Sequence, residues 1–269
     1  MAKNQTERVM GMETKFLLRR DGLEIPCKLS EPEDGDIRRI VVGVHGIGGS
    51  KDDAIQASLA EEMEQFYSVV FRFDFPAHGE NLREGSAMSL DGCVRTLAAV
   101  AAEARQRYPD VEDLCLFASG FGAYVTLVAL EELMALPGRV KLVVQTPSVR
   151  MDETILAMIG FTRETLWTMD QVAMKTKHPI GISYRFYEEL RDHSVMHPYP
   201  IPILILHGEE DAFIRMQDVR QFRRLNERSK LVIIPGTSHR FLESGAWDMV
   251  LDLTRDWFQF EQVLLCDWE

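Results

Sequence analysis

Cysteine is scarce in this 269-residue chain, which has only four. They stand at Cys27, Cys93, Cys115 and Cys266, far apart and without a CxxC pair. Such spacing argues against a structural zinc site and against a disulfide framework. A reduced, cytoplasmic chain is therefore the simplest expectation.

Long apolar runs and an excess of positive charge are also missing. The sequence has no run of about 18 apolar residues, so no membrane span is expected. Residues 1–20 are polar and lack the apolar segment of a secretory signal. The chain carries 30 Lys and Arg against 42 Asp and Glu, a net charge of −12. That balance argues against a nucleic-acid partner, which needs a basic face.

The hydrophobic residues, 46% of the chain, form a pattern of strands alternating with helices. A hairpin is expected at the N-terminus, turning at Asp21-Gly22. Further strands are expected at 40–44, 68–74, 114–118, 140–146, 203–206 and 231–234, and helices at 53–65, 89–108, 121–136, 216–225 and 247–258. This order predicts an α/β fold with a mostly parallel central sheet and helices on both faces. Sites in such sheets lie where the strands end.

One segment interrupts the alternation. Between Thr146 and Ile203 no clear strand is visible, but helical patterns occur at 152–159, 163–174 and 183–190. We expect residues 150–198 to form a helical lid insertion over the strand ends. Residues 1–149 and 199–269 would then form the core.

Three loops that follow expected strands carry residues suited to acyl transfer. The first is Val44-His45-Gly46-Ile47-Gly48-Gly49, whose glycines let the backbone approach a bound carbonyl. The second, residues 206–211, ends in the carboxylate of Asp211. The third, residues 235–241, contains the imidazole of His239. A carboxylate that orients a histidine is the arrangement needed to activate a nucleophile.

Together, these loops resemble those of the α/β-hydrolase superfamily, and the order nucleophile, acid, histidine agrees with that fold. The resemblance implies that Asp211 is the triad acid and His239 the catalytic base. It also implies an oxyanion hole formed by the amides of Ile47 and Phe121. Residues 73–80 resemble a further loop of the family. Across nearly the whole chain, the similarity is closest to bacterial esterases of the cinnamoyl or feruloyl esterase and monoacylglycerol lipase type.

The nucleophile position departs from the family pattern, which is Gly-x-Ser-x-Gly between a strand and a helix. Here the strand leads into Ala118-Ser119-Gly120-Phe121-Gly122-Ala123, and alignment of its last glycine places Gly120 in the serine position. The bend strains its central residue, which costs a serine on the order of 1–3 kcal/mol and glycine almost nothing. Ser119 could be the nucleophile only after a one-residue slip, which would turn every strand side chain to the opposite face.

Three functions are compatible with this pattern. The first is a serine-type carboxylic ester hydrolase for small-molecule esters. This chain would then be inactive or nearly so because Gly120 replaces the nucleophile, in an engineered form or a natural variant. The second is a non-catalytic ligand-binding protein on a hydrolase scaffold. The third is a lyase or decarboxylase that uses His239 and Asp211 without a covalent step. No cofactor is expected, because residues 45–49 lack the spacing of a dinucleotide loop and the lysine of a P-loop.

The expected lid supplies candidate substrate contacts. Its apolar side chains include Trp167, Met169 and Phe186. Most apolar lid side chains are expected to pack onto the sheet, and a few to face the cleft. An apolar or aromatic acyl group is therefore the expected substrate.

Several other residues have simpler structural explanations. His193 and His197 are four apart, as in a helical metal pair, but no third ligand is evident, so no metal is expected. His45 and His207 are expected to order their loops. Cys115 fits a core position in a strand better than the role of a thiol nucleophile.

Overall fold

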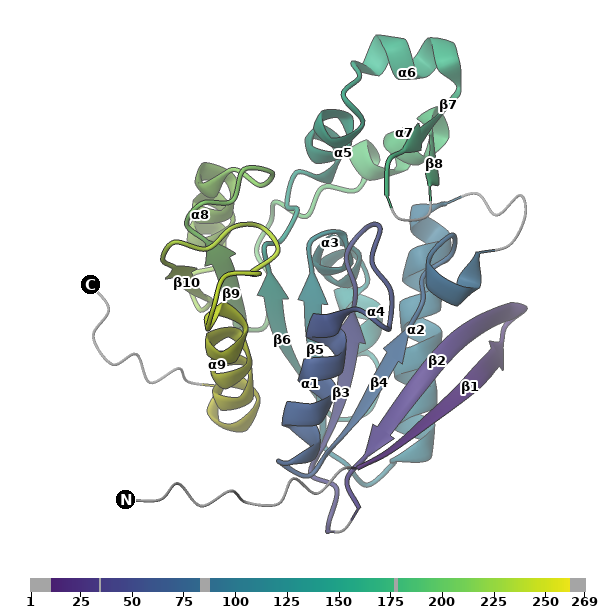
Figure 1. The fold of residues 1–269 in the computed structure, drawn as a ribbon. Coiled ribbons are helices and arrows are strands. Elements are labelled where there is room, and N and C mark those ends of the chain that lie inside the picture. The colour runs from purple at the N-terminus through teal and green to yellow at the C-terminus, as the bar shows by residue number, and fades with distance from the viewer. Residues whose placement is uncertain (1–10, 34, 83–87, 177–178, 262–269) are drawn as a thin grey trace.

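The computed structural model describes residues 11–33, 35–82, 88–176 and 179–261 (Figure 1). Within them, the main sheet has eight strands in the order β1-β2-β4-β3-β5-β6-β9-β10. Their bounds are β1 (Met12–Arg20), β2 (Leu23–Glu31), β3 (Arg39–Val44), β4 (Ser68–Phe73), β5 (Asp113–Ser119), β6 (Arg139–Gln145), β9 (Ile203–Gly208) and β10 (Lys230–Ile234). The pairs β1–β2 and β2–β4 are antiparallel, and the other pairs are parallel. The predicted mostly parallel sheet is confirmed. Cys266 lies outside the described residues.

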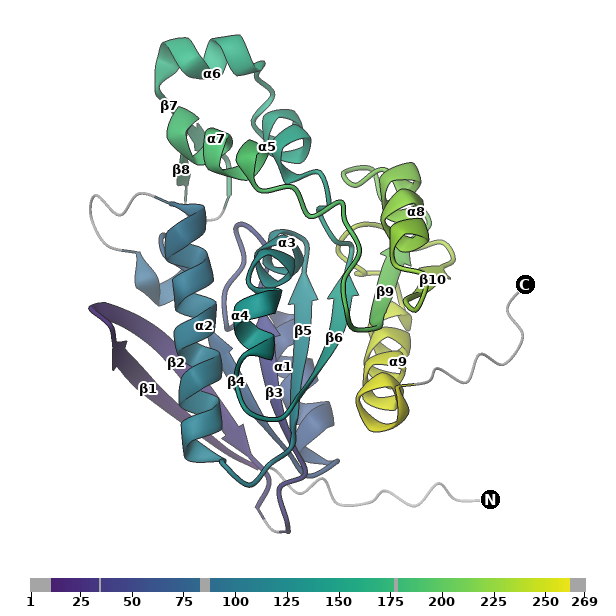
Figure 2. The same ribbon diagram turned by 180° about the vertical axis from the view of Figure 1, so that it is seen from behind.

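Helices cover both faces of the sheet, because its central strands are apolar on both sides. One face packs against α1 (Ala54–Glu64) and α9 (Ala246–Phe260), which stand in front in Figure 1. The other face carries α2 (Leu90–Arg107), α3 (Phe121–Val128), α4 (Leu130–Met134) and α8 (Met216–Leu225), as Figure 2 shows. A short 3-10 turn, η1 (Gly79–Asn81), follows β4. In the described part of the chain, no helix combines the length and apolarity needed to cross a bilayer.

Of two predicted helices, one begins where expected and the other is interrupted. The helix expected from Ser89 begins there, because the Ser89 hydroxyl accepts a hydrogen bond from the Gly92 amide at 3.1 Å. The single helix expected over 121–136 is wrong in detail, since it is interrupted at Ala129 and forms α3 and α4.

Residues 150–198, which we call the cap segment, stand above the carboxyl ends of the strands (Figure 1). They form α5 (Met151–Ile159), α6 (Arg163–Met169), β7 (Gln171–Met174), β8 (Ile180–Ser183) and α7 (Tyr184–Asp192). The expectation of no strand here is wrong, because β7 and β8 pair antiparallel. Strands of four residues alternate too briefly to be recognised. The helix expected over 163–174 ends at Met169, because Asp170 adopts a φ of 63° that an α-helix does not tolerate.

The first turn of α3 lies directly against the end of β3. A Cβ atom at Gly122 would meet the carbonyl oxygen of His45 at 2.3 Å and that of Val44 at 2.9 Å. Only glycine permits this approach of helix to backbone. As a result, the loop after β3 lies beside the bend between β5 and α3.

This contact generates a prediction about Gly122→Ala. The substitution should lower the free energy of unfolding by about 3 kcal/mol, because backbone atoms must move to admit the methyl group. Gly160→Ala is the comparison, since Gly160 has a φ of 72° but open space at its Cβ position. There only the backbone strain of about 1–2 kcal/mol applies. Urea denaturation measures both variants, and a smaller loss for Gly122→Ala than for Gly160→Ala would contradict the packing argument.

Candidate functional site

The loops after β9 and β10 bring a carboxylate and an imidazole together. His239 Nδ1 lies 2.8 Å from Asp211 Oδ2, although 28 residues separate the two in sequence. The strands are parallel neighbours, so their following loops share one edge of the sheet. A backbone hydrogen bond of 2.9 Å from the Glu210 amide to the Thr237 carbonyl also joins the loops. The structure therefore places the two residues together as the sequence predicts.

Asp211 is held as a carboxylate. Its side chain is fully buried, and Oδ1 accepts hydrogen bonds from the amides of Phe213 at 2.8 Å and Ile214 at 2.9 Å. Burial raises the pKa of Asp211, but the bond to His239 and those from the two amides outweigh it, so the pKa lies below its usual value. The ionised carboxylate fixes the proton on His239 Nδ1. His239 Nε2 is then the nitrogen left to exchange a proton with a substrate.

Gly120 occupies the sharp bend between β5 and α3. Its backbone has φ 52° and ψ −113°, a conformation that side chains of L-residues rarely adopt. No heavy atom outside the neighbouring residues lies within 4 Å of the position that a Cβ atom would take. The backbone thus has the form of a nucleophile elbow, with open space where a serine side chain would begin.

Ser119, the alternative nucleophile, belongs to β5 rather than to the bend. Its hydroxyl lies 2.9 Å from Gln145 Oε1 on the neighbouring strand β6. The Gly120 amide also donates to the Gln145 carbonyl, at 2.9 Å. These contacts fix the end of β5 in one register, and they engage the Ser119 hydroxyl away from the bend.

The loop of residues 45–49 passes beside this elbow. A Cβ atom at Gly46 would lie 3.3 Å from the carbonyl oxygen of Ser119. Ile47 is half-buried and packs against the main core. Phe121 begins α3, so its amide belongs to the positive end of the helix dipole. The two amides expected to form the oxyanion hole therefore come from adjoining backbone segments, and their role in catalysis stays a prediction.

Two buried histidines fasten this loop to the loop after β4. His45 Nε2 accepts the Phe75 amide at 3.1 Å, and His78 Nε2 accepts the Gly48 amide at 3.0 Å. Their Nδ1 atoms lie within 2.9 Å of the carbonyl oxygens of Gly46 and Pro76. His45 thus orders its loop as expected, whereas the role of His78 was not foreseen.

Burial keeps both rings neutral. It lowers the pKa of His45 and, with a contribution from His45, lowers the pKa of His78 to about 4. A neutral ring can accept a backbone hydrogen bond at Nε2, and a protonated ring cannot. The loop contacts therefore require deprotonated histidines.

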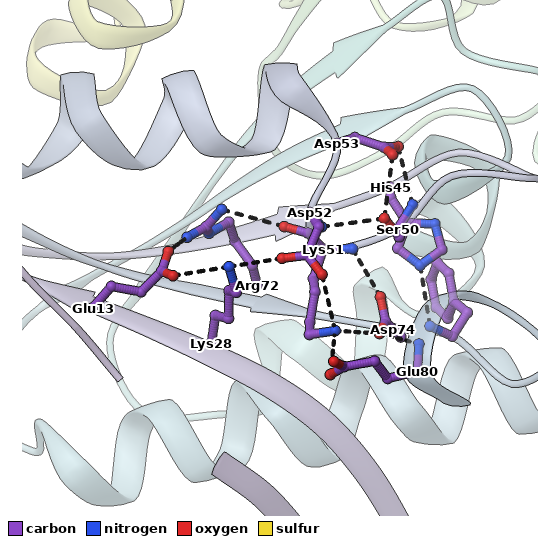
Figure 3. Close-up of polar contacts among 11 residues, drawn as sticks. Glu13, Lys28, His45, Ser50, Lys51, Asp52, Asp53, Arg72, Asp74 and Glu80 are labelled. Atoms are coloured by element: carbon purple, nitrogen blue, oxygen red, sulfur yellow. Dashed lines mark hydrogen bonds and ion pairs between the residues drawn. The ribbon is translucent and has the colours of Figure 1, made fainter. Parts of the chain in front are cut away.

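Beneath the same loop lies a buried ion pair that sequence reasoning missed (Figure 3). Lys51 Nζ lies 2.7 Å from Asp74 Oδ2 and 2.8 Å from Glu80 Oε2, while Asp74 Oδ1 accepts the Lys51 amide at 2.8 Å. Burial lowers the pKa of Lys51, but these carboxylates raise it above the usual lysine value. The polar network continues through Asp52, Lys28, Glu13 and Arg72.

The Asp74 carboxylate also explains why a glycine stands at position 79. Gly79 has a φ of 50°, and a Cβ atom there would meet the Asp74 carboxylate at 2.4 Å. The carboxylate can then accept the Glu80 amide at 2.9 Å. One buried side chain therefore positions both the turn before α1 and the turn after β4. The sequence signal was an aspartate directly after an apolar strand.

The three lid residues named as substrate contacts lie in different surroundings. Trp167 and Met169 are 66% and 51% exposed on α6, the element of the cap segment farthest from the sheet (Figure 1). Phe186 is buried, with its ring 6.0 Å from that of Phe121. Phe186 is thus the one placed beside the elbow helix. A Cβ atom at Gly48 would lie 2.7 Å from the side chain of Thr176, so the cap segment touches the loop of residues 45–49.

The structure also shows the surroundings of the cysteine and the histidines that the sequence offered as further candidates. Burial raises the pKa of Cys115 to about 12, which opposes a thiolate role. His207 is fully buried, and burial lowers its pKa. His193 Nδ1 lies 2.8 Å from the Glu189 carbonyl oxygen, and His197 is exposed. In the described ranges, no group of three or more His, Cys, Asp or Glu is arranged to hold a metal ion.

Comparison with known families identifies the fold. The alpha/beta hydrolase family model matches residues 41–253, which include the elbow, Asp211 and His239. This chain belongs to the alpha/beta hydrolase family. The predicted α/β-hydrolase fold is therefore confirmed. No curated protein sequence matches the chain.

Solved structures show the same fold at low sequence identity. Est1E from Butyrivibrio proteoclasticus, with ferulic acid bound, superimposes with a TM-score of 0.77 and 18% identity over 92% of this chain and 98% of that chain. Mouse alpha/beta hydrolase domain-containing protein 10 superimposes with a TM-score of 0.73 and 14% identity over 93% of this chain and 100% of that chain. A serine hydrolase without a lid from Xanthomonas campestris superimposes with a TM-score of 0.60 and 20% identity over 90% of this chain and 92% of that chain.

The neutral state of His78 generates a prediction for this alpha/beta hydrolase. A histidine whose folded pKa is depressed stabilises the fold above its unfolded pKa of 6.5, and that contribution is lost as the pH falls toward 4. His78→Gln keeps an acceptor for the Gly48 amide and cannot titrate. The unfolding free energy of the unmodified chain should fall between pH 6.5 and 4. In His78→Gln this fall should be smaller by on the order of 3 kcal/mol.

Chemical denaturation at a series of pH values measures this effect. His193→Gln, at an exposed position on the cap segment, is the matched control for a histidine-to-glutamine exchange. An identical pH dependence for His78→Gln and the unmodified chain would contradict the assignment.

Proposed function

We propose that this chain is a serine-type carboxylic ester hydrolase scaffold whose nucleophile position is occupied by Gly120. Its ligands are small-molecule esters or acids with an apolar or aromatic acyl group. One observation carries the proposal: the elbow conformation of Gly120 occurs in the same chain as the 2.8 Å bond between His239 and Asp211. The carboxylate–imidazole pair serves acyl transfer when a hydroxyl stands at the elbow.

With a serine at position 120, the proposed chemistry is that of a serine hydrolase. His239 Nε2 would take the hydroxyl proton as the oxygen attacks the ester carbonyl. Asp211, held as a carboxylate, would stabilise the resulting imidazolium. The amides of Ile47 and Phe121 would bind the tetrahedral oxyanion. His239 would then return the proton to the leaving alcohol, and water would release the acid by the same route.

With glycine at position 120, the covalent route is closed, but the binding site is retained. The loop of residues 45–49 and the Asp211–His239 pair do not depend on a hydroxyl at the elbow. The chain would therefore bind esters and acids with little or no turnover. The same observation leaves two other functions to be tested: a non-catalytic ligand-binding protein, and a lyase or decarboxylase that uses His239 and Asp211 alone.

The structural neighbours support this substrate class. Est1E has the most similar fold of the three structures described above, and it was solved with ferulic acid, an aromatic carboxylic acid. Phe186 and Phe121 give this chain aromatic rings next to the elbow helix. We further propose that residues 150–198 act as a lid over residues 1–149 and 199–269, and that the protein is cytoplasmic.

Gly120→Ser is the test of this function. Hydrolysis of p-nitrophenyl acetate and butyrate should rise by roughly 10³-fold or more over the unmodified chain, because the missing nucleophile is supplied to an intact base. The variant should also lose about 1–3 kcal/mol of stability, since a serine is strained at a φ of 52°. Spectrophotometric release of p-nitrophenol and urea denaturation measure the two effects.

A second variant separates the alternatives. Adding His239→Ala to Gly120→Ser should abolish the gained activity. If the unmodified chain turned over a substrate and His239→Ala abolished that activity, the lyase or decarboxylase would be favoured instead. A folded Gly120→Ser variant that hydrolyses no ester of a broad panel would refute the esterase proposal and leave ligand binding.

A further inference from the structure

Phe213 is a large apolar residue that stands exposed beside the proposed catalytic base. Its exposed fraction is 58%, whereas Ile214 in the same loop is 4% exposed. In the loop that carries His239, Phe241 is likewise buried, at 1%. The two loops thus turn Ile214 and Phe241 inward, but they leave the Phe213 ring in solvent.

The position of this ring is fixed relative to the triad. The Phe213 amide donates to Asp211 Oδ1 at 2.8 Å, and Asp211 Oδ2 binds His239 Nδ1 at 2.8 Å. The Phe213 and His239 rings are 5.2 Å apart between centroids, with an interplanar angle of 57°. One buried carboxylate therefore holds both His239 and the backbone of Phe213, and the Phe213 ring lies beside the imidazole.

A second exposed apolar side chain belongs to the same pair of loops. Leu242, three residues after His239, is 70% exposed. The cap segment also reaches the start of α8 beside these loops, where Glu153 pairs with Arg215, but it leaves Phe213 and Leu242 exposed. The side of the site formed by the loops after β9 and β10 therefore presents apolar surface to solvent. Exposed apolar surface beside a polar reaction centre is typical of a ligand-binding wall.

We propose that Phe213 is the specificity-determining residue of this site. Its ring packs against an aromatic group attached to the acyl carbon of the ester. This inference rests on the proposed ester hydrolase function and names its substrate class: esters of arylalkanoic acids in preference to short aliphatic acids. An aryl group gains both area burial and an aromatic pair contact with Phe213, whereas an acetyl group reaches neither.

The test compares two esters with the same leaving group in the Gly120→Ser background. The substrates are p-nitrophenyl phenylacetate and p-nitrophenyl acetate. Adding Phe213→Ala should lower kcat/KM for the phenylacetate by about 10-fold or more, with less than a threefold change for the acetate. Phe213→Tyr keeps the ring and should restore most of the preference. Phe260→Ala, at an exposed phenylalanine of similar exposure (63%) in α9, is the matched control.

The ratio of the two kcat/KM values separates specificity from structure. Phe213→Ala retains the amide that binds Asp211, so the acetate reaction reports whether the triad is intact. An equal loss for both esters would overturn the proposal, since it would mean that Phe213 only supports His239. If Phe213→Ala changed kcat/KM for neither ester, the proposal would be overturned as well.

A binding experiment distinguishes failure of this inference from failure of the proposed function. If Gly120→Ser hydrolyses neither ester, phenylacetate is titrated into the unmodified chain and into Phe213→Ala by isothermal calorimetry. A Kd that is fivefold or more weaker in Phe213→Ala supports the aromatic contact even without esterase activity. Equal Kd values, or no saturable binding to the unmodified chain, refute it.

Discussion

The hydrogen bond between His239 and the buried carboxylate of Asp211 is the interaction on which the site depends. It joins the loops of two neighbouring parallel strands, β9 and β10, which only the sheet topology brings together. The carboxylate has a second function, because its other oxygen accepts two amides of its own loop and so fixes the position of Phe213. A single buried charge therefore orients His239, the proposed base, sets its tautomer and holds the backbone of Phe213, whose ring we propose contacts the acyl group.

The opposite side of the site is built around a different buried carboxylate, that of Asp74. It binds Lys51 through both side chain and backbone, and it shapes the turn at Gly79. Above it, neutral His45 and His78 tie the loop of residues 45–49 to the loop after β4. These contacts require neither a nucleophile nor a substrate. They explain how the elbow and its neighbouring loop keep their form with glycine at position 120, where glycine relieves the strain that a serine would carry.

The sequence predicted those parts of the structure that depend on local pattern. The parallel strands are continuous apolar runs, and Asp211 and His239 stand in the loops that follow two of them. The register at Gly120 followed from backbone conformation, because glycine favours a bend with positive φ. The parts that were missed depend on contacts between distant segments or on very short elements. The strands β7 and β8 have four residues each, the Lys51–Asp74 pair spans 23 residues, and the exposure of Phe213 reflects how two loops meet.

Covalent labelling tests the central claim, that only the nucleophile is missing from an otherwise assembled triad. The purified Gly120→Ser variant is treated with a fluorophosphonate, which reacts with serines activated by a neighbouring base, and is analysed by intact-mass and peptide mass spectrometry. A single adduct at position 120 is expected, which is absent from the unmodified chain and from the variant that also carries His239→Ala. A folded Gly120→Ser variant that remains unlabelled, or that labels equally without His239, would contradict the account.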